Sequence, residues 1–207
     1  RQRLASGIVE ESERLARLTD NTLQLARLDA PNVALRCDWE STEEIIGAVL
    51  RRIRRRPDGG RVRAWVESGL PLLWCDAMLV SQLLDNLLDN GLKYSPADSP
   101  VEIHARRDRD ELVLTVSDRG PGIAPAWQER VFEAFQRGEP PLLNGGSHES
   151  PRGAGVGLAV CRAIARAHHG DVRLLARGEG GCVFECRLPL DGHCQAPPAA
   201  AVPEAKP

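Results

Sequence analysis

The stretch LLDNLLDNGLKYS, residues 83–95, constrains the fold more than any other part of the sequence. Asn86, Asn90 and Lys93 are four and then three residues apart, so they share one face of a helix. Asparagine is a poor helix former, so two amides at this spacing lower the helix propensity. A solvated face is the simplest interpretation, and a polar binding face is the alternative. Leucines recur at the spacings of a buried helix face: Leu79, Leu83, Leu84, Leu87 and Leu88.

The composition is that of a globular protein of moderate size. The chain has 207 residues, of which 42% are hydrophobic and 27% charged, enough for one domain and an appendage. The formal net charge is −2, without the strong basic surface that indicates nucleic-acid binding. No apolar run approaches the roughly 20 residues that span a bilayer, and no signal-peptide pattern opens the chain. We therefore expect no nucleic-acid partner, and a membrane contact only through other parts of a longer parent protein.

The six cysteines form no CxxC pair and no Cys/His spacing typical of a zinc site. Cys182 and Cys186 share one face of a predicted strand, where a rise of about 3.3 Å per residue places them too far apart for a disulfide. We interpret all six as small buried hydrophobic residues of a protein in a reducing compartment. The other four are Cys37, Cys75, Cys161 and Cys194.

Residues 1–29 form one long helical pattern without a turn signal. Its apolar side chains form a seam along one side, which a single helix cannot bury alone. The helix therefore needs a partner helix from this chain or from a second copy. The pattern is already under way at Arg1 without a capping signal, and we expect the natural helix to begin earlier. The seam alternates spacings of four and three, with two polar interruptions: Leu4, Ile8, Glu11, Leu15, Leu18, Thr22 and Leu25.

Between residues 35 and 190, strand and helix patterns are mixed without a strict β–α–β alternation. This mixture predicts an α/β fold, a two-layer sandwich of one mixed β-sheet with helices on one face. The Ala- and Pro-rich stretch 191–207 is predicted to be a disordered tail. Strands are predicted at 35–40, 61–67, 101–107, 112–118, 171–177 and 182–190, and helices at 41–53, 76–94, 126–135 and 155–169.

Two glycine-rich motifs could bind a ligand. The strand 112–118 ends in DRGPGI, where Asp118 meets Gly120 and Gly122; glycines let a ligand approach the backbone, and a carboxylate accepts an amine. GAGVGL, residues 153–158, opens a helix whose N-terminal N–H groups attract phosphate. It is neither a Walker loop, since no G-K-[ST] follows, nor a dinucleotide fingerprint, since no strand directly precedes it. Each motif alone is weak evidence, and a tight turn after a strand is the simpler interpretation of the first.

The order of the motifs resembles one known family. The Asn-Asn-Lys helix, the Asp-x-Gly-x-Gly turn, VFEAFQR at 131–137 and the Gly-rich helix start resemble the N, G1, F and G2 boxes of sensor histidine kinases. Their ATP-binding fold, the Bergerat fold, is shared with gyrase-type ATPases, Hsp90 chaperones and MutL. The resemblance covers roughly residues 35–190 as the catalytic ATP-binding domain. RGPGI and GLAVCRAIARAHHG look most similar to the potassium-responsive, Kdp-type sensor kinases.

Residues 1–30 in turn resemble the second helix of the hairpin for dimerisation and phosphate acceptance that precedes this domain in such kinases. The acceptor histidine belongs to the first helix of that hairpin, and this sequence has none in that context. We interpret all five histidines as structural or surface residues: His104, His148, His168, His169 and His193. The resemblance therefore implies ATP binding, with transfer of the γ-phosphate only to a histidine absent from this chain.

The resemblance also implies roles for single residues, with ATP and Mg²⁺ as cofactors. Asn90 is expected to coordinate Mg²⁺, while Asn86 and Lys93 contact the phosphates. Asp118 is expected to accept the adenine amine, and Arg137 to be the cation near the γ-phosphate. Asn86, Lys93 and Arg137 are the implied catalytic residues. The rest of the implied nucleotide site is Tyr94, Gly120, Gly122, Ile123, Gly153, Gly155, Gly157 and Leu158.

Residues 124–157 match the ATP lid of the family, with Phe132 and Phe135 as hinge and packing residues rather than nucleotide contacts. The members that hydrolyse ATP carry a glutamate base where Asn86 stands. An amide cannot take a proton from water, so Asn86 fits an enzyme that keeps its γ-phosphate for transfer.

Three alternatives have the same fold. An ATP-hydrolysing or nucleotide-gated clamp protein is disfavoured by Asn86. A serine kinase of the anti-sigma type is disfavoured by the long N-terminal helix. A non-catalytic dimerisation module is disfavoured by the intact motifs. For the leading interpretation, the implied partners are a response regulator and a second copy paired through the hairpin helices. The implied location is the cytoplasmic side of a bacterial inner-membrane sensor.

Overall fold

A computed structural model describes residues 2–28, 34–135, 155–175 and 180–192 of the chain. The main sheet has five strands: β2 (Val62–Val66), β4 (Val101–Asp108), β5 (Glu111–Ser117), β6 (Asp171–Leu175) and β7 (Val183–Pro189). They lie in the order β2-β4-β5-β7-β6, with β2 parallel to β4 and the other neighbours antiparallel. Two short strands pair with each other outside this sheet: β1 (Asp38–Glu40) and β3 (Leu73–Cys75).

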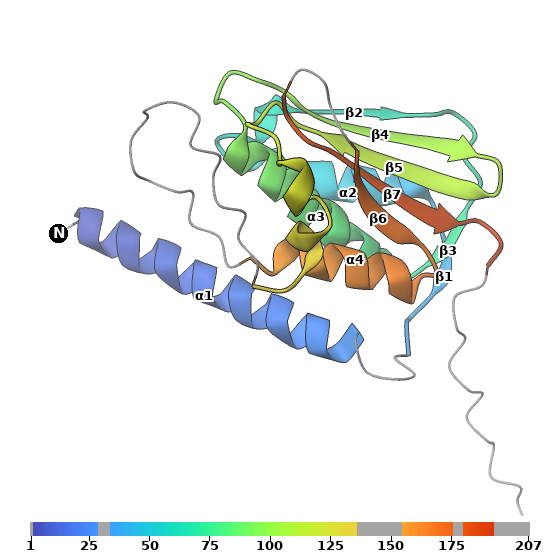
Figure 1. The fold of residues 1–207 in the computed structure, drawn as a ribbon, viewed down its shortest axis with the longest axis horizontal. Helices are drawn as coiled ribbons and strands as arrows, with labels where there is room; N and C mark the ends of the chain where they lie inside the picture. Colours follow the sequence, from blue (N-terminus) through green and yellow to red (C-terminus); the bar gives the residue numbers. More distant parts are fainter. Residues whose placement is uncertain (1, 29–33, 136–154, 176–179, 193–207) are drawn as a thin grey trace, which may run out of the picture.

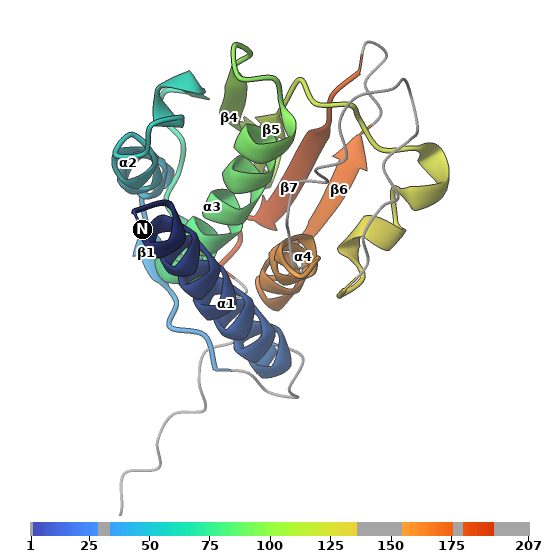
Figure 2. The same ribbon diagram turned by 90° about the vertical axis from the view of Figure 1, so that its left-hand side faces the viewer.

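The helices lie on one face of the main sheet. They are α1 (Gln2–Leu28), α2 (Thr42–Ile53), α3 (Ala77–Tyr94) and α4 (Gly157–Ala167). Figures 1 and 2 show α2, α3 and α4 against the sheet, with α1 on the outer side of this helical layer. The prediction of an α/β fold with one mixed sheet, helices on one face and a long helix ahead of it is confirmed.

α3 lies at the centre of the core. Asp76 caps its N-terminus, because its Oδ1 accepts the backbone N–H groups of Met78 and Leu79 at 3.1 and 3.2 Å. Leu79 is only partly buried and packs at the margin of the core. The rest of the leucine stripe is fully buried and belongs to the same cluster as the inward-facing residues of β4, β5 and β7: Leu83, Leu84, Leu87 and Leu88.

α1 finds its partner within the chain, against α4. Leu18, Leu25 and Leu28 pack against the core, and Asn21 Oδ1 accepts a hydrogen bond from Gln82 Nε2 at 3.4 Å. Leu15, which the predicted seam included, is 56% exposed. A straight helix turns about 100° per residue, so when Leu18, Leu25 and Leu28 face the core, Leu15 is turned toward solvent. The side chains of residues 4, 8 and 11 lie outside the described part of the chain.

Two local predictions were wrong. Residues 126–135 form two 3₁₀ turns, Pro125–Trp127 and Arg130–Phe132, instead of a helix. The chain leaves the helical path at Glu133, which is extended, because Val131 and Phe132 are buried one after the other. The strand expected at 35–40 is shorter, and it pairs with β3, which the sequence did not indicate. The tail 193–207 lies outside the described residues.

The cysteine interpretation holds for four residues and fails for Cys37. Cys75, Cys161, Cys182 and Cys186 are buried free thiols, and burial raises the pKa of Cys75 and Cys182 to about 12. Cys37 is disulfide-bonded and only half-buried, so it is neither a core residue nor the reduced thiol that the expected reducing compartment implies. Cys194 lies outside the described residues.

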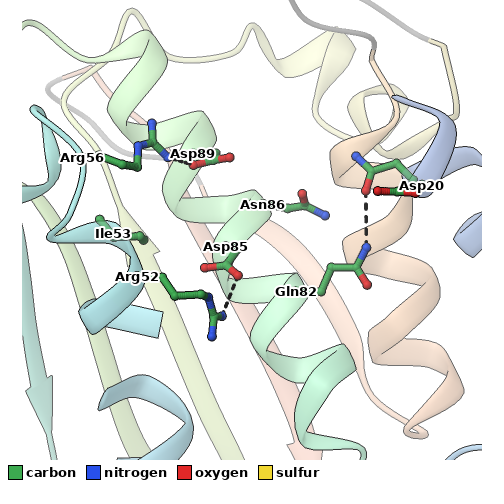
Figure 3. Close-up of a pocket in the computed structure, with 9 residues that line it drawn as sticks. Asp20, Arg52, Ile53, Arg56, Gln82, Asp85, Asn86 and Asp89 are labelled. Carbon is green, nitrogen blue, oxygen red and sulfur yellow. Dashed lines mark hydrogen bonds and ion pairs between the residues drawn. The ribbon is translucent and has the colours of Figure 1, made fainter. Parts of the chain in front are cut away.

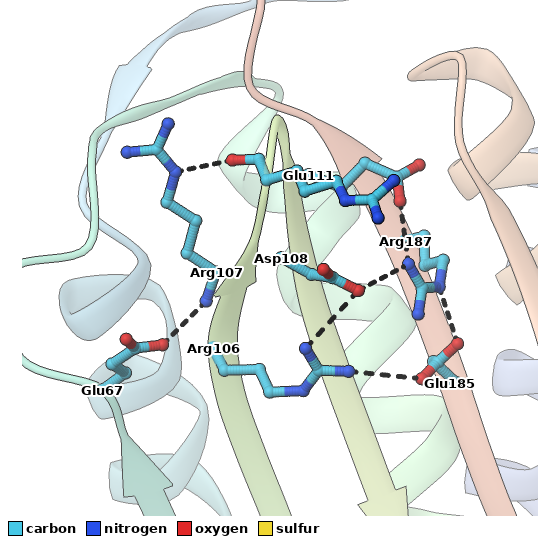
Figure 4. A network of polar contacts seen from close by, with 8 residues as sticks. Glu67, Arg106, Arg107, Asp108, Glu111, Glu185 and Arg187 are labelled. Atoms are coloured by element: carbon cyan, nitrogen blue, oxygen red, sulfur yellow. Dashed lines mark hydrogen bonds and ion pairs between the residues drawn. The ribbon is translucent and has the colours of Figure 1, made fainter.

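The face of the main sheet opposite the helices carries an ion-pair network (Figure 4). Arg187 of β7 contacts Glu185, Glu111 and Asp108 at 2.7, 2.9 and 3.1 Å. The hydrogen bond from Arg187 and the nearby Arg106 lower the pKa of Asp108. The side chains of Arg187, Asp108 and Glu111 are 30%, 35% and 44% exposed, and ion pairs so open to solvent contribute little to stability. Among the described helices, none combines the length and the apolar character of a membrane span.

His168 is a structural residue, as predicted, and joins the end of α4 to the start of α3. Its side chain is 4% exposed. Nδ1 lies 2.8 Å from the carbonyl of Ile164, and Nε2 accepts the N–H of Asp76 at 3.0 Å. Both contacts require the neutral ring with its proton on Nδ1. Burial lowers the pKa of His168 below its ordinary value of 6.5. His169 and His104 are exposed, whereas residues 148 and 193 lie outside the described residues.

This geometry predicts an acid-sensitive contribution to stability. Because the folded-state pKa of His168 is lowered, the unfolded chain binds more protons, and stability is lost as the pH falls below about 6.5. We expect His168→Gln to cost about 1–3 kcal/mol in the free energy of unfolding at pH 7.5 and clearly less at pH 5.5. Urea unfolding at both pH values measures this difference. His169→Asn, at the exposed neighbour, is the control, and an equal cost for His168→Gln at both pH values would contradict the assignment.

Candidate functional site

The polar face of α3 turns away from the core, as the sequence predicted. Asn86, Asn90 and Lys93 are half-buried on this face. Asn86 Nδ2 is buried beside the Cys161 thiol, which is only a weak hydrogen-bond acceptor. A buried amide without a strong partner costs free energy, which is consistent with a site that a ligand completes. Lys93 Nζ donates to the hydroxyl of Tyr94 at 3.2 Å, and the Tyr94 ring is 43% exposed.

The N-terminus of α4 lies directly against this face. A Cβ built on Gly157 would be 3.8 Å from Asn86 Cγ, so the first turn of α4 approaches α3 closely. No side chain of the described residues caps α4, and its first turn holds no acidic residue. Its leading N–H groups and its partial positive charge therefore remain available next to Asn86. Leu158 packs against the core and holds this turn in place.

Asp118 lies at the end of β5 and is 5% exposed. Its Oδ1 accepts the backbone N–H of Gly120 at 2.7 Å and that of Cys182 at 3.1 Å. The N–H of Asp118 donates to the carbonyl of Cys182 at 2.9 Å. These bonds fix the carboxylate between the DRGPG turn and the start of β7. The nearby Asp118 carboxylate adds to burial in raising the pKa of the Cys182 thiol.

Close backbone approach around Asp118 requires glycine. Gly181 has φ +85°, and a Cβ there would lie 2.2 Å from the carbonyl oxygen of Asp118. A Cβ on Gly120 would be 3.0 Å from both Asp118 Oδ1 and the carbonyl oxygen of Tyr94. A Cβ on Gly91 would be 3.5 Å from Asp118 Cβ, so α3 packs directly against the Asp118 side chain. The sequence analysis missed Gly91 and Gly181; the GG pair just before the last strand was the available signal.

The two ends of the predicted lid meet. The N–H of Phe135 donates to the carbonyl of Gly155 at 2.9 Å. Phe132 is buried, as expected of a packing residue, with its ring edge against Phe184. The guanidinium of Arg162 lies 4.5 Å from the Phe132 ring centroid and ties this segment to α4. The lid segment between these ends, including the predicted site residues Arg137 and Gly153, lies outside the described residues.

A cavity of about 330 Å³ lies between α1, α2 and α3, on the other side of Asn86 (Figure 3). Arg52 pairs with Asp85 at 2.7 Å and Arg56 pairs with Asp89, which joins α2 to α3 along one wall. Burial raises the pKa of Asp85 despite the nearby Arg52. The lining is polar apart from one isoleucine: Asp20, Asn21, Arg52, Ile53, Arg56, Gln82, Asp85, Asn86 and Asp89.

Those predicted site residues that the structure describes thus lie close to one another. The polar face of α3, the Asp118 turn with Gly122 and the half-buried Ile123, and the start of α4 surround one region of the helical face. A family model described as histidine kinase-, DNA gyrase B-, and HSP90-like ATPase matches residues 75–192, which contain all of these parts.

The chain belongs to this family.

Curated relatives of the chain are sensor kinases, as the resemblance predicted. The sensor protein KdpD of Clostridium acetobutylicum is 31% identical over 192 residues, covering 92% of this chain and 21% of the relative. KdpD of Escherichia coli is 32% identical over 187 residues, covering 90% of this chain and 20% of the relative. The sensor-like histidine kinase SenX3 of Mycobacterium tuberculosis is 32% identical over 190 residues, with coverage of 91% and 45%. The chain therefore spans between about a fifth and somewhat less than half of the length of these relatives.

Solved structures of histidine kinases have the same fold. Full-length ShkA, in complex with AMPPNP, superposes with a TM-score of 0.74 at 25% identity, covering 97% of this chain and 40% of that one. The histidine kinase AdeS of Acinetobacter baumannii superposes with a TM-score of 0.73 at 21% identity, covering 92% of this chain and 86% of that one. The predicted family and fold are confirmed by these likenesses, and the two KdpD relatives support the Kdp-type resemblance.

Proposed function

We propose that this chain is the catalytic, ATP-binding region of a two-component sensor histidine kinase, and that it transfers the γ-phosphate of ATP to a histidine outside these residues. The observation that carries the proposal is the meeting of three parts: the amide and lysine face of α3, the buried Asp118 carboxylate, and the uncapped start of α4. Family membership and the sensor-kinase relatives support it.

The purine subsite is proposed at Asp118. Its carboxylate, held by two backbone N–H groups, would accept the exocyclic amine of adenine. Gly120 and Gly122 carry no side chains that would block the base, Ile123 contributes an apolar contact, and Tyr94 borders the nucleotide from the end of α3. A 6-amino purine is thereby favoured over a 6-oxo purine, whose oxygen would meet the carboxylate.

The triphosphate subsite is proposed between α3 and α4. The N–H groups at Gly155, Gly157 and Leu158, with the helix dipole, would hold phosphate oxygens. Asn86 and Lys93 would contact the phosphates from α3, and Gly153 and Arg137 belong to the same proposal on the lid. The closeness of the first turn of α4 to the Asn86 amide supports a phosphate contact at that side chain.

A magnesium ion fits this subsite. Hard Mg²⁺ takes oxygen ligands and is commonly bound through few protein groups plus phosphates and water. Asn90 offers one amide oxygen on the same helix face, and the described residues contain no cluster of three or more His, Cys, Asp or Glu that could hold a metal alone. Asn90 would hold Mg²⁺ against the triphosphate, where the ion supplies charge neutralisation during phosphoryl transfer.

The polar face of α3 favours transfer over hydrolysis. A water nucleophile needs a base, and the amide of Asn86 cannot accept its proton. Asn86, Lys93 and Arg137 would position and stabilise the γ-phosphate, and the acceptor imidazole supplies its own nucleophilic nitrogen. This chemistry disfavours the ATP-hydrolysing clamp.

Sensor histidine kinases generally act with response regulators and dimerise. We propose the same for the parent protein of this chain: a response regulator as the receiver of the phosphate, pairing of two copies through the hairpin to which α1 belongs, and a cytoplasmic location in a bacterial membrane sensor. The proposed domains are 1–30 for the hairpin helix and 35–190 for the catalytic domain.

The metal role of Asn90 is testable by calorimetry. Asn90→Ala should weaken ATP binding by about ten-fold or more with Mg²⁺ present, and little with EDTA, because the lost ligand acts through the ion. Gln82→Ala, on the α1-facing side of the same helix, is the matched control and should leave both affinities unchanged. Equal weakening of Asn90→Ala with and without Mg²⁺ would remove the metal role.

Phosphotransfer is the test of the proposed function. Incubated alone with radiolabelled ATP, the chain should take up no acid-labile phosphate, because its described histidines have structural or surface roles. Mixed with a fragment of the parent protein containing the acceptor helix, it should label that fragment at its histidine. Asn90→Ala should abolish the labelling. Labelling of any of the five histidines of the chain itself, located by mass spectrometry, would overturn the proposal.

A further inference from the structure

Arg61 donates hydrogen bonds to the carbonyls at the end of α3. It is the last residue of the 3₁₀ turn Gly59–Arg61, directly before β2, and its side chain is half-buried. The last carbonyls of a helix lack partners within the helix, and a guanidinium presents several N–H groups in one plane. The Arg61 guanidinium donates hydrogen bonds to four backbone carbonyl oxygens: Pro96 at 2.6 Å, Ser99 at 2.9 Å, Leu92 at 3.3 Å and Ser95 at 3.5 Å.

The segment that Arg61 holds is in contact with the Asp118 turn. Ser95 ends α3, is 8% exposed, and its Oγ accepts the N–H of Arg119 at 3.2 Å. The carbonyl oxygen of Tyr94 lies 3.0 Å from the position of a Cβ on Gly120. Tyr94 and Ser95 therefore both pack against the residues that follow Asp118. Two hydrogen bonds in series, Arg61 to Ser95 and Ser95 to Arg119, reach the residue next to the carboxylate.

The surrounding arginines have other partners or face solvent. In the arginine-rich run at 51–56, Arg52 and Arg56 pair with Asp85 and Asp89 of α3. Arg63, two residues after Arg61 on β2, is exposed. Among the described arginines of this region, Arg61 alone donates to several backbone carbonyls at and just after the end of α3. Arg61 therefore fixes the backbone that follows the C-terminus of α3.

We propose that Arg61 is a positioning residue of the purine subsite and sets selectivity for 6-amino purines. By fixing the carbonyls after α3, it fixes Ser95 and Tyr94 against the Asp118 turn, and so the direction in which the carboxylate meets the base. Hydrogen bonds weaken steeply when their geometry is lost, so a relaxed turn would lower recognition of the amine before it lowers phosphate binding. The inference rests on the proposed function, because it assigns Arg61 to the adenine subsite.

The test compares ATP with ITP, which differ in the amine that Asp118 would accept. Affinities of both nucleotides with Mg²⁺ are measured by calorimetry on the whole chain, for the parent, Arg61→Met, Arg61→Lys and Arg63→Ala. The parent should prefer ATP. Both Arg61 variants should reduce the ATP/ITP affinity ratio by about three- to ten-fold, the worth of one weakened hydrogen bond. Arg63→Ala should leave the ratio unchanged.

The ratio separates positioning from a merely structural role. An Arg61 variant with a lower melting temperature but the parent ratio would overturn the inference. Ser95→Ala removes the second hydrogen bond of the series and provides an independent variant if the Arg61 variants do not fold; it should also lower the ratio, and an unchanged ratio would overturn the inference. A parent chain that binds neither nucleotide would instead overturn the proposed function, and this inference with it.

Discussion

The packing of α3 against the sheet is the constraint on which the rest of the structure depends. Leu83, Leu84, Leu87 and Leu88 are fully buried, so the helix has one allowed rotation about its axis. Asn86, Asn90 and Lys93 are thereby held on the opposite side. A shift of one residue would turn the helix by about 100° and bury amides in place of leucines, at a cost of several kcal/mol for unpaired polar groups. The polar face is therefore set by the apolar one.

The sheet brings the remaining parts of the site to this helix. β5 ends at Ser117 and β7 begins at Val183, and their antiparallel pairing places Asp118 beside Cys182 although they are far apart in sequence. Gly91 and Gly181 allow α3 to approach the Asp118 side chain and the start of β7 to approach the Asp118 backbone. α4 then presents its N-terminus to Asn86. The site is a meeting of four chain segments, each held in place by the core rather than by a ligand.

Local patterns were sufficient for the parts of this site that the sequence predicted. The leucine period predicted α3 and its polar face, and the DRGPG turn predicted the carboxylate with its glycines. Features that depend on contacts between distant segments were missed. Arg61 belongs to an arginine-rich stretch and shows no local sign that it reaches the end of α3, and Leu15 has the spacing of its seam but faces solvent. Strand order and the β1–β3 pair depend on the same long-range contacts.

Backbone-amide NMR tests the location of the nucleotide most directly. In a titration of the labelled chain with Mg²⁺ and a non-hydrolysable ATP analogue, the account predicts the largest shift changes at Asn86, Asn90, Gly120 and Gly157. Residues on the opposite face of the sheet, such as His104 and Glu185, should be unaffected. Shift changes concentrated on that opposite face, with the four site amides unchanged, would contradict the claim that the α3 face, the Asp118 turn and the start of α4 form one nucleotide site.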